Sequence, residues 1–193
     1  MIRMIGVLGV LSLMGFTTPP GLVIQPDSRI WVEGKSTVRD FKCTAGVVEG
    51  RVEAGATPLS LPTIQTAVAS VDLAIPVDKL ACGNGTMDEH MKKALKASEH
   101  GTIEFRLTGY TAAPPAADTS ELELRGVLRI AGVDQPVTVR ADATQEADGT
   151  LRVQGSQTIA MTKWGVKPPS LMLGTMKVKD EVVIHFDIRL RQQ

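Results

Sequence analysis

Apolar and polar residues alternate one by one along most of the chain, and the alternation is clearest in the last segment. There, every second residue is apolar and the residues between are mainly polar. The apolar positions are Val182, Ile184, Phe186, Ile188 and Leu190, and the intervening ones are Val183, His185, Asp187, Arg189 and Arg191. A period of two residues is typical of a β-strand that is buried on one face.

The same pattern recurs in residues 29–39, 67–75, 103–108, 122–130, 137–142 and 151–159, and less regularly in 41–53. Together with the last segment, it predicts about eight strands. A single open sheet of these strands would leave one apolar face in water. We therefore expect an all-β protein whose sheet closes into a barrel or folds into a sandwich.

One stretch has the period of a helix instead. Thr86 and Glu89 have the spacing of a capping box, in which the side chains satisfy free amide groups at a helix start. Gly101 is placed to end the helix. One face is apolar, and it holds Met87, Met91, Ala94 and Leu95. This predicts a short amphipathic helix over about residues 86–98 that lies against the barrel or across one end.

The alternation also selects the apolar side chains that share one interior. The selected residues are Val71, Leu73, Phe105, Leu107, Leu124, Leu128, Val139, Ile159, Ile184 and Phe186. A shift of one residue would turn each of them to the opposite face, so the assignment depends on the register. Some of them would line a pore and others would pack a closed end, and the sequence leaves that division open.

An unusually apolar loop precedes the last strand. It holds Trp164, Pro168, Pro169, Met172 and Met176 among few charges. A loop of this composition needs a cover, so we expect Trp164, Met172 and Met176 to border a ligand entrance or to cover a bound chain. The alternative is that Trp164 fills the barrel end as part of the core.

The first residues read as a targeting segment. Arg3 is followed by an apolar run, Met4 to Phe16, which has the length of the apolar part of a signal peptide. The alternative is a buried element of the domain. We expect a signal peptide over residues 1–20, one domain over 21–193 and export. In an exported chain the pair Cys43 and Cys82 predicts a disulfide, with two buried thiols as the alternative.

Several kinds of chemistry are not supported by the sequence. The formal net charge is zero and no long basic run occurs, which argues against a nucleic-acid partner. No hydrolase elbow, zinc-protease motif or phosphate-binding loop is found. His90, His100 and His185 are far apart in the sequence, so we expect neither a metal site nor a cofactor. The methionines of the apolar loop are better read as packing residues than as soft-metal ligands.

The order of five short segments resembles the YceI-like family of lipid- and polyisoprenoid-binding proteins. The segments are residues 31–41 (WVEGKSTVRDF), 87–96 (MDEHMKKALK), 126–137 (GVLRIAGVDQPV), 161–166 (MTKWGV) and 174–186 (GTMKVKDEVVIHF). Each segment is weakly specific alone, whereas their succession over about residues 25–190 is specific.

The resemblance implies a closed antiparallel, lipocalin-like β-barrel around an elongated apolar pore. It also implies non-covalent binding of a long-chain amphiphile, isoprenoid or fatty-acid-like, in a periplasmic or secreted protein. Membrane contact would then be transient at most, and the oligomeric state is left open. Two other functions stay open: an enzyme that acts on a lipid or a stress-related metabolite, and a structural or interaction module with a filled core.

Overall fold

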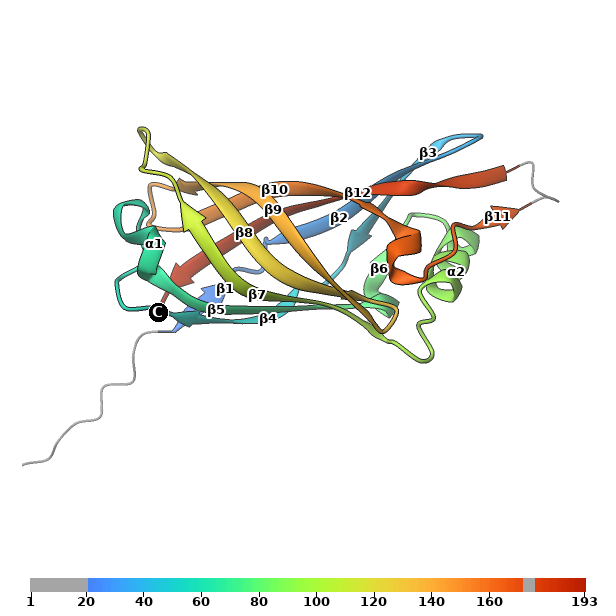
Figure 1. The fold of residues 1–193 in the computed structure, drawn as a ribbon, viewed down its shortest axis with the longest axis horizontal. Helices are drawn as coiled ribbons and strands as arrows, with labels where there is room; N and C mark the ends of the chain where they lie inside the picture. Colours follow the sequence, from blue (N-terminus) through green and yellow to red (C-terminus); the bar gives the residue numbers. More distant parts are fainter. Residues whose placement is uncertain (1–20, 172–175) are drawn as a thin grey trace, which may run out of the picture.

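The strands expected from the alternating pattern form one antiparallel sheet that closes on itself (Figure 1). The computed structural model describes residues 21–171 and 176–193, with only the backbone described at 171 and 176. The strands are β1 (Leu22–Ile24), β2 (Arg29–Ser36), β3 (Asp40–Ala45), β4 (Glu49–Ala54), β5 (Val68–Pro76), β6 (Leu80–Ala81), β7 (Thr102–Ala112), β8 (Thr119–Ile130), β9 (Val133–Gln145), β10 (Leu151–Ala160), β11 (Ser170–Leu171) and β12 (Met176–Gln192).

Three pairs of consecutive strands each form one interrupted strand along the barrel wall, which is called a stave here. The pairs are β1 with β2, β3 with β4, and β5 with β6. β1 and β2 pair with successive parts of β12, while β4 pairs with β1 and β3 pairs with β2. β5 and β6 extend the next stave in the same way. The staves β7, β8, β9 and β10 then return to β12. The result is a closed antiparallel barrel of eight staves, which confirms the expected barrel and excludes the sandwich.

One end of the barrel is closed by two short helices, η1 (Leu61–Thr63) and α1 (Ile64–Ala67) (Figure 1). Neither helix is among the elements that the sequence pattern predicts. The hydroxyl of Tyr110 fixes α1 in place, because it donates to the Ile64 carbonyl at 2.5 Å and accepts from the Val68 amide at 3.2 Å.

The residues at this closed end form a closely packed core. Leu61 and Ile64 are each 4% exposed, and Ala67 is completely buried. They pack with residues from the barrel wall, namely Leu22, Val52, Leu122, Ala141, Ala143, Leu151, Ile188 and Leu190. The closed end therefore resembles the interior of an ordinary globular protein.

The opposite end carries α2 (Gly85–Ala94) and η3 (Met161–Trp164) (Figure 1). The expected amphipathic helix is present, but its bounds differ from 86–98. Asn84 is the N-cap and accepts from the Met87 amide at 3.1 Å, so Thr86 already lies in the first turn and the capping box with Glu89 is not formed. The helix ends at Ala94, because Lys96 has a left-handed φ of 53°.

A disulfide fastens α2 to the barrel. Cys43 in β3 and Cys82, just before α2, are bonded with their Cα atoms 3.9 Å apart. The neighbouring pairs Thr44–Ala81 and Ala45–Leu80 place the bridge at the end of the ladder between β3 and β6. The predicted disulfide is thus confirmed, and the alternative of two free thiols is excluded.

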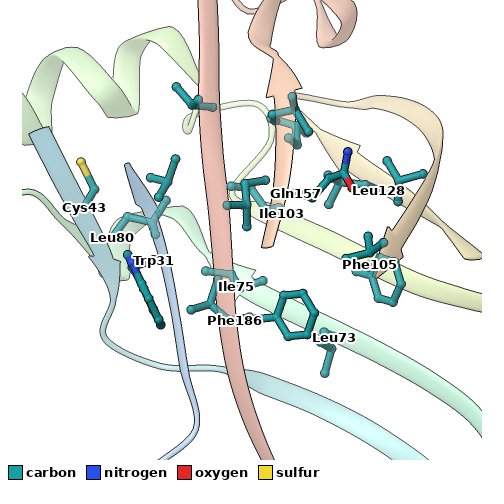
Figure 2. A pocket seen from close by; sticks show the side chains of 18 of the residues that line it. Trp31, Cys43, Leu73, Ile75, Leu80, Ile103, Phe105, Leu128, Gln157 and Phe186 are labelled. Atoms are coloured by element: carbon teal, nitrogen blue, oxygen red, sulfur yellow. The ribbon is translucent and has the colours of Figure 1, made fainter. Parts of the chain in front are cut away.

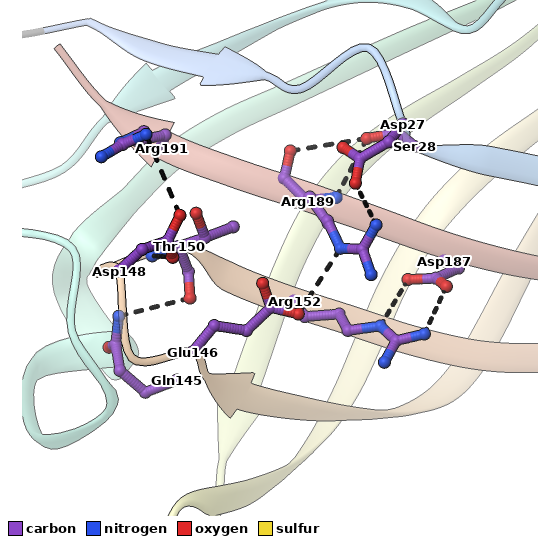
Figure 3. A network of polar contacts seen from close by, with 10 residues as sticks. All are labelled: Asp27, Ser28, Gln145, Glu146, Asp148, Thr150, Arg152, Asp187, Arg189 and Arg191. Carbon is purple, nitrogen blue, oxygen red and sulfur yellow. Dashed lines mark hydrogen bonds and ion pairs between the residues drawn. The ribbon is translucent and has the colours of Figure 1, made fainter.

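A network of charged side chains covers the outer wall near the closed end (Figure 3). Arg152 donates to both carboxylate oxygens of Asp187, at 2.8 and 2.6 Å. Arg189 pairs with Asp27 from the turn between β1 and β2, and with Glu146 from the turn between β9 and β10 at 3.5 Å. The hydrogen bonds from Arg152 hold the pKa of Asp187 below its ordinary value. The network ties both turns to β12.

Among the helices of the described residues, none combines the length and the hydropathy that a bilayer-crossing helix requires. The predicted signal peptide over residues 1–20 lies outside the described residues.

Candidate ligand-binding cavity

An apolar cavity of about 480 Å³ runs inside the barrel from the closed end to the end covered by α2. Ile64 and Leu151 line its closed end, whereas Arg39, Asn84 and His90 line the end at α2. Figure 2 shows side chains from several strands pointing into the same space. The volume lies within the range of small-molecule sites, which are about 300–1,000 Å³.

All the side chains that the alternation assigned to one interior line this cavity, and Trp164 lines it as well. They are Val71, Leu73, Phe105, Leu107, Leu124, Leu128, Val139, Ile159, Ile184 and Phe186. Met172 lies outside the described residues, as does the side chain of Met176. The shared interior is therefore a feature of the fold, while contact of these residues with a ligand stays a prediction.

The side chains in the middle of the barrel are only half-buried although they point inward. Leu73, Phe105 and Phe186 belong to this group, whereas Leu151 at the closed end is 1% exposed. Their remaining free surface faces the cavity. Apolar surface left uncovered in this way favours an apolar guest.

Three phenylalanine rings keep close to the wall because each packs on a glycine in a strand. A Cβ atom at Gly34, Gly126 or Gly155 would lie 2.3, 2.4 or 2.6 Å from the ring of Phe41, Phe105 or Phe186, respectively. Only glycine leaves room for this close approach.

The end of the barrel opposite α1 is called the open end here, and it is covered by α2 and the disulfide. Met87, Met91, Ala94 and Leu95 of this helical segment line the cavity, as do both cysteines. The sulfur atoms of Cys82 and Met91 lie 3.6 Å apart. No residue of α2 is fully buried, in contrast to α1. The apolar face of α2 is thus only partly covered by the protein.

Trp164 is part of the packed wall at this end. It is 2% exposed, and its indole N–H donates to the Leu128 carbonyl at 2.9 Å. Its neighbours in the core include Ile159, Val166 and Val182. The structure supports the alternative in which Trp164 fills the barrel end as core.

Further lining residues were not selected from the sequence. Ile30 and Val32 in β2, and Val153 and Gln157 in β10, also line the cavity. The signal was present, since Val153 and Gln157 are separated from Ile159 by even numbers of residues and so lie on the same face of the strand.

The titratable groups with shifted pKa values form no reactive centre in this cavity. Tyr110 lines it and its pKa is raised by burial, but its hydroxyl is bonded to the α1 backbone. The lowered pKa of Asp180 comes from hydrogen bonds of Thr162, and that of Asp134 from Arg129. Within residues 21–171 and 176–193, no three His, Cys, Asp or Glu side chains gather as metal ligands do. The cavity is suited to holding an apolar molecule.

A closed antiparallel barrel of eight staves around an apolar cavity defines a lipocalin-like binding barrel. The chain belongs to the YceI-like family, because residues 26–190 match its YceI-like domain. No curated protein sequence is detectably similar to the chain.

Solved structures share this fold at low sequence identity. BcnA of Burkholderia cenocepacia is 18% identical, with a TM-score of 0.65 over 84% of this chain and 95% of that chain. A polyisoprenoid binding domain of Saccharophagus degradans, implicated in plant cell wall breakdown, is 8% identical, with a TM-score of 0.68 over 90% and 99%. The YceI protein of Campylobacter jejuni is 14% identical, with a TM-score of 0.56 over 78% and 84%.

Proposed function

We propose that this protein is an exported, periplasmic or secreted carrier that holds one long-chain amphiphilic lipid, isoprenoid or fatty-acid-like, without a covalent bond. The observation that carries the proposal is the cavity of about 480 Å³, whose described lining is almost entirely apolar. Membership of the YceI-like family and the fold shared with a polyisoprenoid binding domain support it.

The energetics of burial support binding by an apolar pore alone. Each buried methylene contributes about 0.8 kcal/mol, so a chain with about ten buried methylenes gains on the order of 8 kcal/mol before ordering costs. Half-buried side chains such as Leu73 and Phe186 supply the matching surface. Polar contacts would then select among ligands rather than provide most of the affinity.

Export is supported by the disulfide between Cys43 and Cys82, since disulfides persist in oxidising compartments such as the periplasm. It is also supported by the apolar run that follows Arg3. A carrier is favoured over an enzyme because the described lining is mostly apolar, and its titratable side chains do not converge: His90 lies at the α2 end and Tyr110 near the closed end.

Native mass spectrometry of the secreted protein tests this function directly. We expect one lipid per chain, recovered chemically unchanged after prolonged incubation. Val153→Trp places a large ring in the cavity and should reduce the amount of bound lipid several-fold. Gln154→Trp makes the same change on the exposed side of β10 and should leave it unchanged.

A thermal melt of each variant should accompany the measurement, since overpacking destabilises folds by about 1–3 kcal/mol. Protein that carries no lipid and takes up neither geranylgeraniol nor palmitic acid from detergent would contradict the carrier function. Conversion of the bound lipid would favour the enzyme instead.

A further inference from the structure

Gln157 places an amide inside the apolar cavity. It lies on β10 opposite Ile184 of β12, and its side chain points inward with those of Val153 and Ile159. Figure 2 shows its amide group among the side chains that line the cavity.

The other polar residues that line the cavity differ from Gln157 in position or in bonding. Ser36, Arg39, Asn84, Thr86 and His90 belong to the β2–β3 hairpin or to the start of α2, at the open end. Tyr110 lies near the closed end, and its hydroxyl is bonded to the backbone of Ile64 and Val68. Among the described residues, Gln157 is therefore the side chain that brings an amide into the cavity between these two ends.

The orientation of the amide follows from the way β9 and β10 separate. Their ladder runs from the pair Leu151–Gln145 to the pair Gly155–Ala141 and stops there. Just beyond this point, Nε2 of Gln157 donates to the Thr158 carbonyl at 3.0 Å. This bond fixes which end of the amide is the nitrogen. The oxygen Oε1 is left without a hydrogen-bond partner among the described residues.

A carbonyl oxygen covered by hydrocarbon without a hydrogen bond is unfavourable. A bound chain that is apolar along its whole length would therefore bind less well than one carrying a donor at this depth. A charged group would be disfavoured at this depth, because an unpaired buried charge is costly and Arg39, the arginine of the described lining, lies in the β2–β3 hairpin at the open end. The chemistry that fits Oε1 is a neutral donor, and a hydroxyl is the smallest one.

On the basis of the proposed carrier function, we infer that Gln157 determines ligand specificity by accepting a hydrogen bond from a hydroxyl group of the bound chain. The ligand class is then a long-chain alcohol or a related neutral amphiphile. Its hydroxyl is held inside the barrel, rather than at the open end among Arg39, Asn84 and His90.

Competition between two probes with equal numbers of heavy atoms tests this inference. Delipidated protein is equilibrated with detergent micelles that hold equal amounts of hexadecan-1-ol and heptadecane, and the two complexes are counted by native mass spectrometry. We expect the wild-type protein to prefer the alcohol. The preference should fall roughly five- to tenfold in Gln157→Met, which keeps the length of the side chain but removes the acceptor. Gln154→Met on the exposed face of the same strand should leave it unchanged.

A second measurement needs no variant. Among hexadecanol isomers with the hydroxyl at successive carbons, wild-type affinity should peak at one position. A flat series would overturn the inference. So would an unchanged preference in Gln157→Met, because Gln157 would then serve only to cap the Thr158 carbonyl. Equal binding of both probes would overturn the inference and leave the carrier function standing, whereas binding of neither would contradict both.

Discussion

At one end of the barrel the covering helix is packed into the core, and at the other it is not. Ile64 of α1 is 4% exposed and Ala67 is completely buried. By contrast, no residue of α2 is buried, although Met87 and Met91 turn toward the cavity. Each helix covers one end of the barrel (Figure 1), but only α1 is packed into the core.

The difference indicates how each cover is held. The packing of α1 stabilises the closed end in the absence of any ligand. At the open end, α2 is held by the disulfide between Cys43 and Cys82. It is also held by the hydrogen bond that the Cys82 amide donates to Asp88 at 2.6 Å. The apolar face of α2 is thereby left for a bound ligand. Closed-end variants should therefore act on folding, and variants of α2 on ligand retention.

The largest effect on stability is expected from a variant of Trp164. This residue lies near the open end, but it is as deeply buried as the core residues of the closed end. Trp164→Ala should lower the free energy of unfolding of the lipid-free protein by about 3–5 kcal/mol, because it leaves a large cavity and removes the hydrogen bond to the Leu128 carbonyl. Urea unfolding measures this. Trp31→Ala removes a half-buried ring that stacks on His185, so it is the control for stability alone and should cost about 1 kcal/mol. A small loss of stability with weaker lipid binding would place Trp164 at the entrance instead.

Removal of the disulfide should have the next largest effect. The double variant Cys43→Ser and Cys82→Ser releases a loop with a sequence separation of 39 residues. The chain-entropy relation gives a loss of about 4 kcal/mol for a loop of this length. Hydrogen exchange adds a sharper test, because amide exchange should rise in α2 and stay slow in α1. Equal exchange at both ends would contradict the different attachment of the two covers.

A truncation at the closed end should reduce stability without affecting selectivity for ligands. Leu61→Ala should cost about 2–4 kcal/mol in urea unfolding, since Leu61 is in the packed core and, unlike Ile64, is not among the lining residues of the cavity. Leu61→Met keeps the side-chain volume and should cost less than about 1.5 kcal/mol. Lipid affinity of the folded protein should stay the same in both. A marked drop in affinity would show that the closed end also contacts the ligand.

The pair of Arg152 and Asp187 makes the closed end sensitive to acid. Asp187→Asn should cost about 1–3 kcal/mol at neutral pH, because it weakens two charge-assisted hydrogen bonds. The pKa of Asp187 is lowered in the folded protein. Its contribution is therefore complete above the unfolded value of about 3.9 and is lost as the pH falls through the lower folded value. Urea unfolding of both proteins between neutral and acidic pH should show the difference vanish in acid. A constant difference would contradict it.

The smallest change in stability is expected in α2. Met91→Ala should cost less than about 1 kcal/mol in the lipid-free protein, because Met91 is only half-buried. Lipid dissociation should become several-fold faster, since the side chain lines the cavity beside the disulfide. The exposed Lys93→Ala is the matched control on the same helix. Unchanged dissociation in Met91→Ala would show that α2 does not cover the guest.

Alternation within strands predicted a closed barrel or a sandwich and selected part of the lining, and the resemblance to the YceI-like family favoured the barrel. A strand such as β12 keeps its period of two over many residues, so Ile184 and Phe186 were placed inside without structural information. The disulfide was expected because the chain contains two cysteines and has features of an exported protein.

Short elements carried too little signal to be predicted. α1 has only four residues, which is about one turn and leaves no period to detect. The start of α2 was misplaced because Asn84 and Thr86 are both good capping residues two positions apart. The split of three staves into shorter strands depends on contacts between distant segments, such as the bond from the Gly46 amide to the Lys79 carbonyl at 2.9 Å.

The glycines beneath the phenylalanine rings set the internal bore of the barrel. Opposite Phe186, a methyl group at position 155 would meet the ring and also the Arg140 carbonyl, each at 2.6 Å. The carbonyl belongs to the wall, so the ring would have to swing into the lumen. One methyl group on the backbone would thereby narrow the passage by the thickness of an aromatic ring. The widest chain that this barrel admits is therefore set by residues that have no side chain.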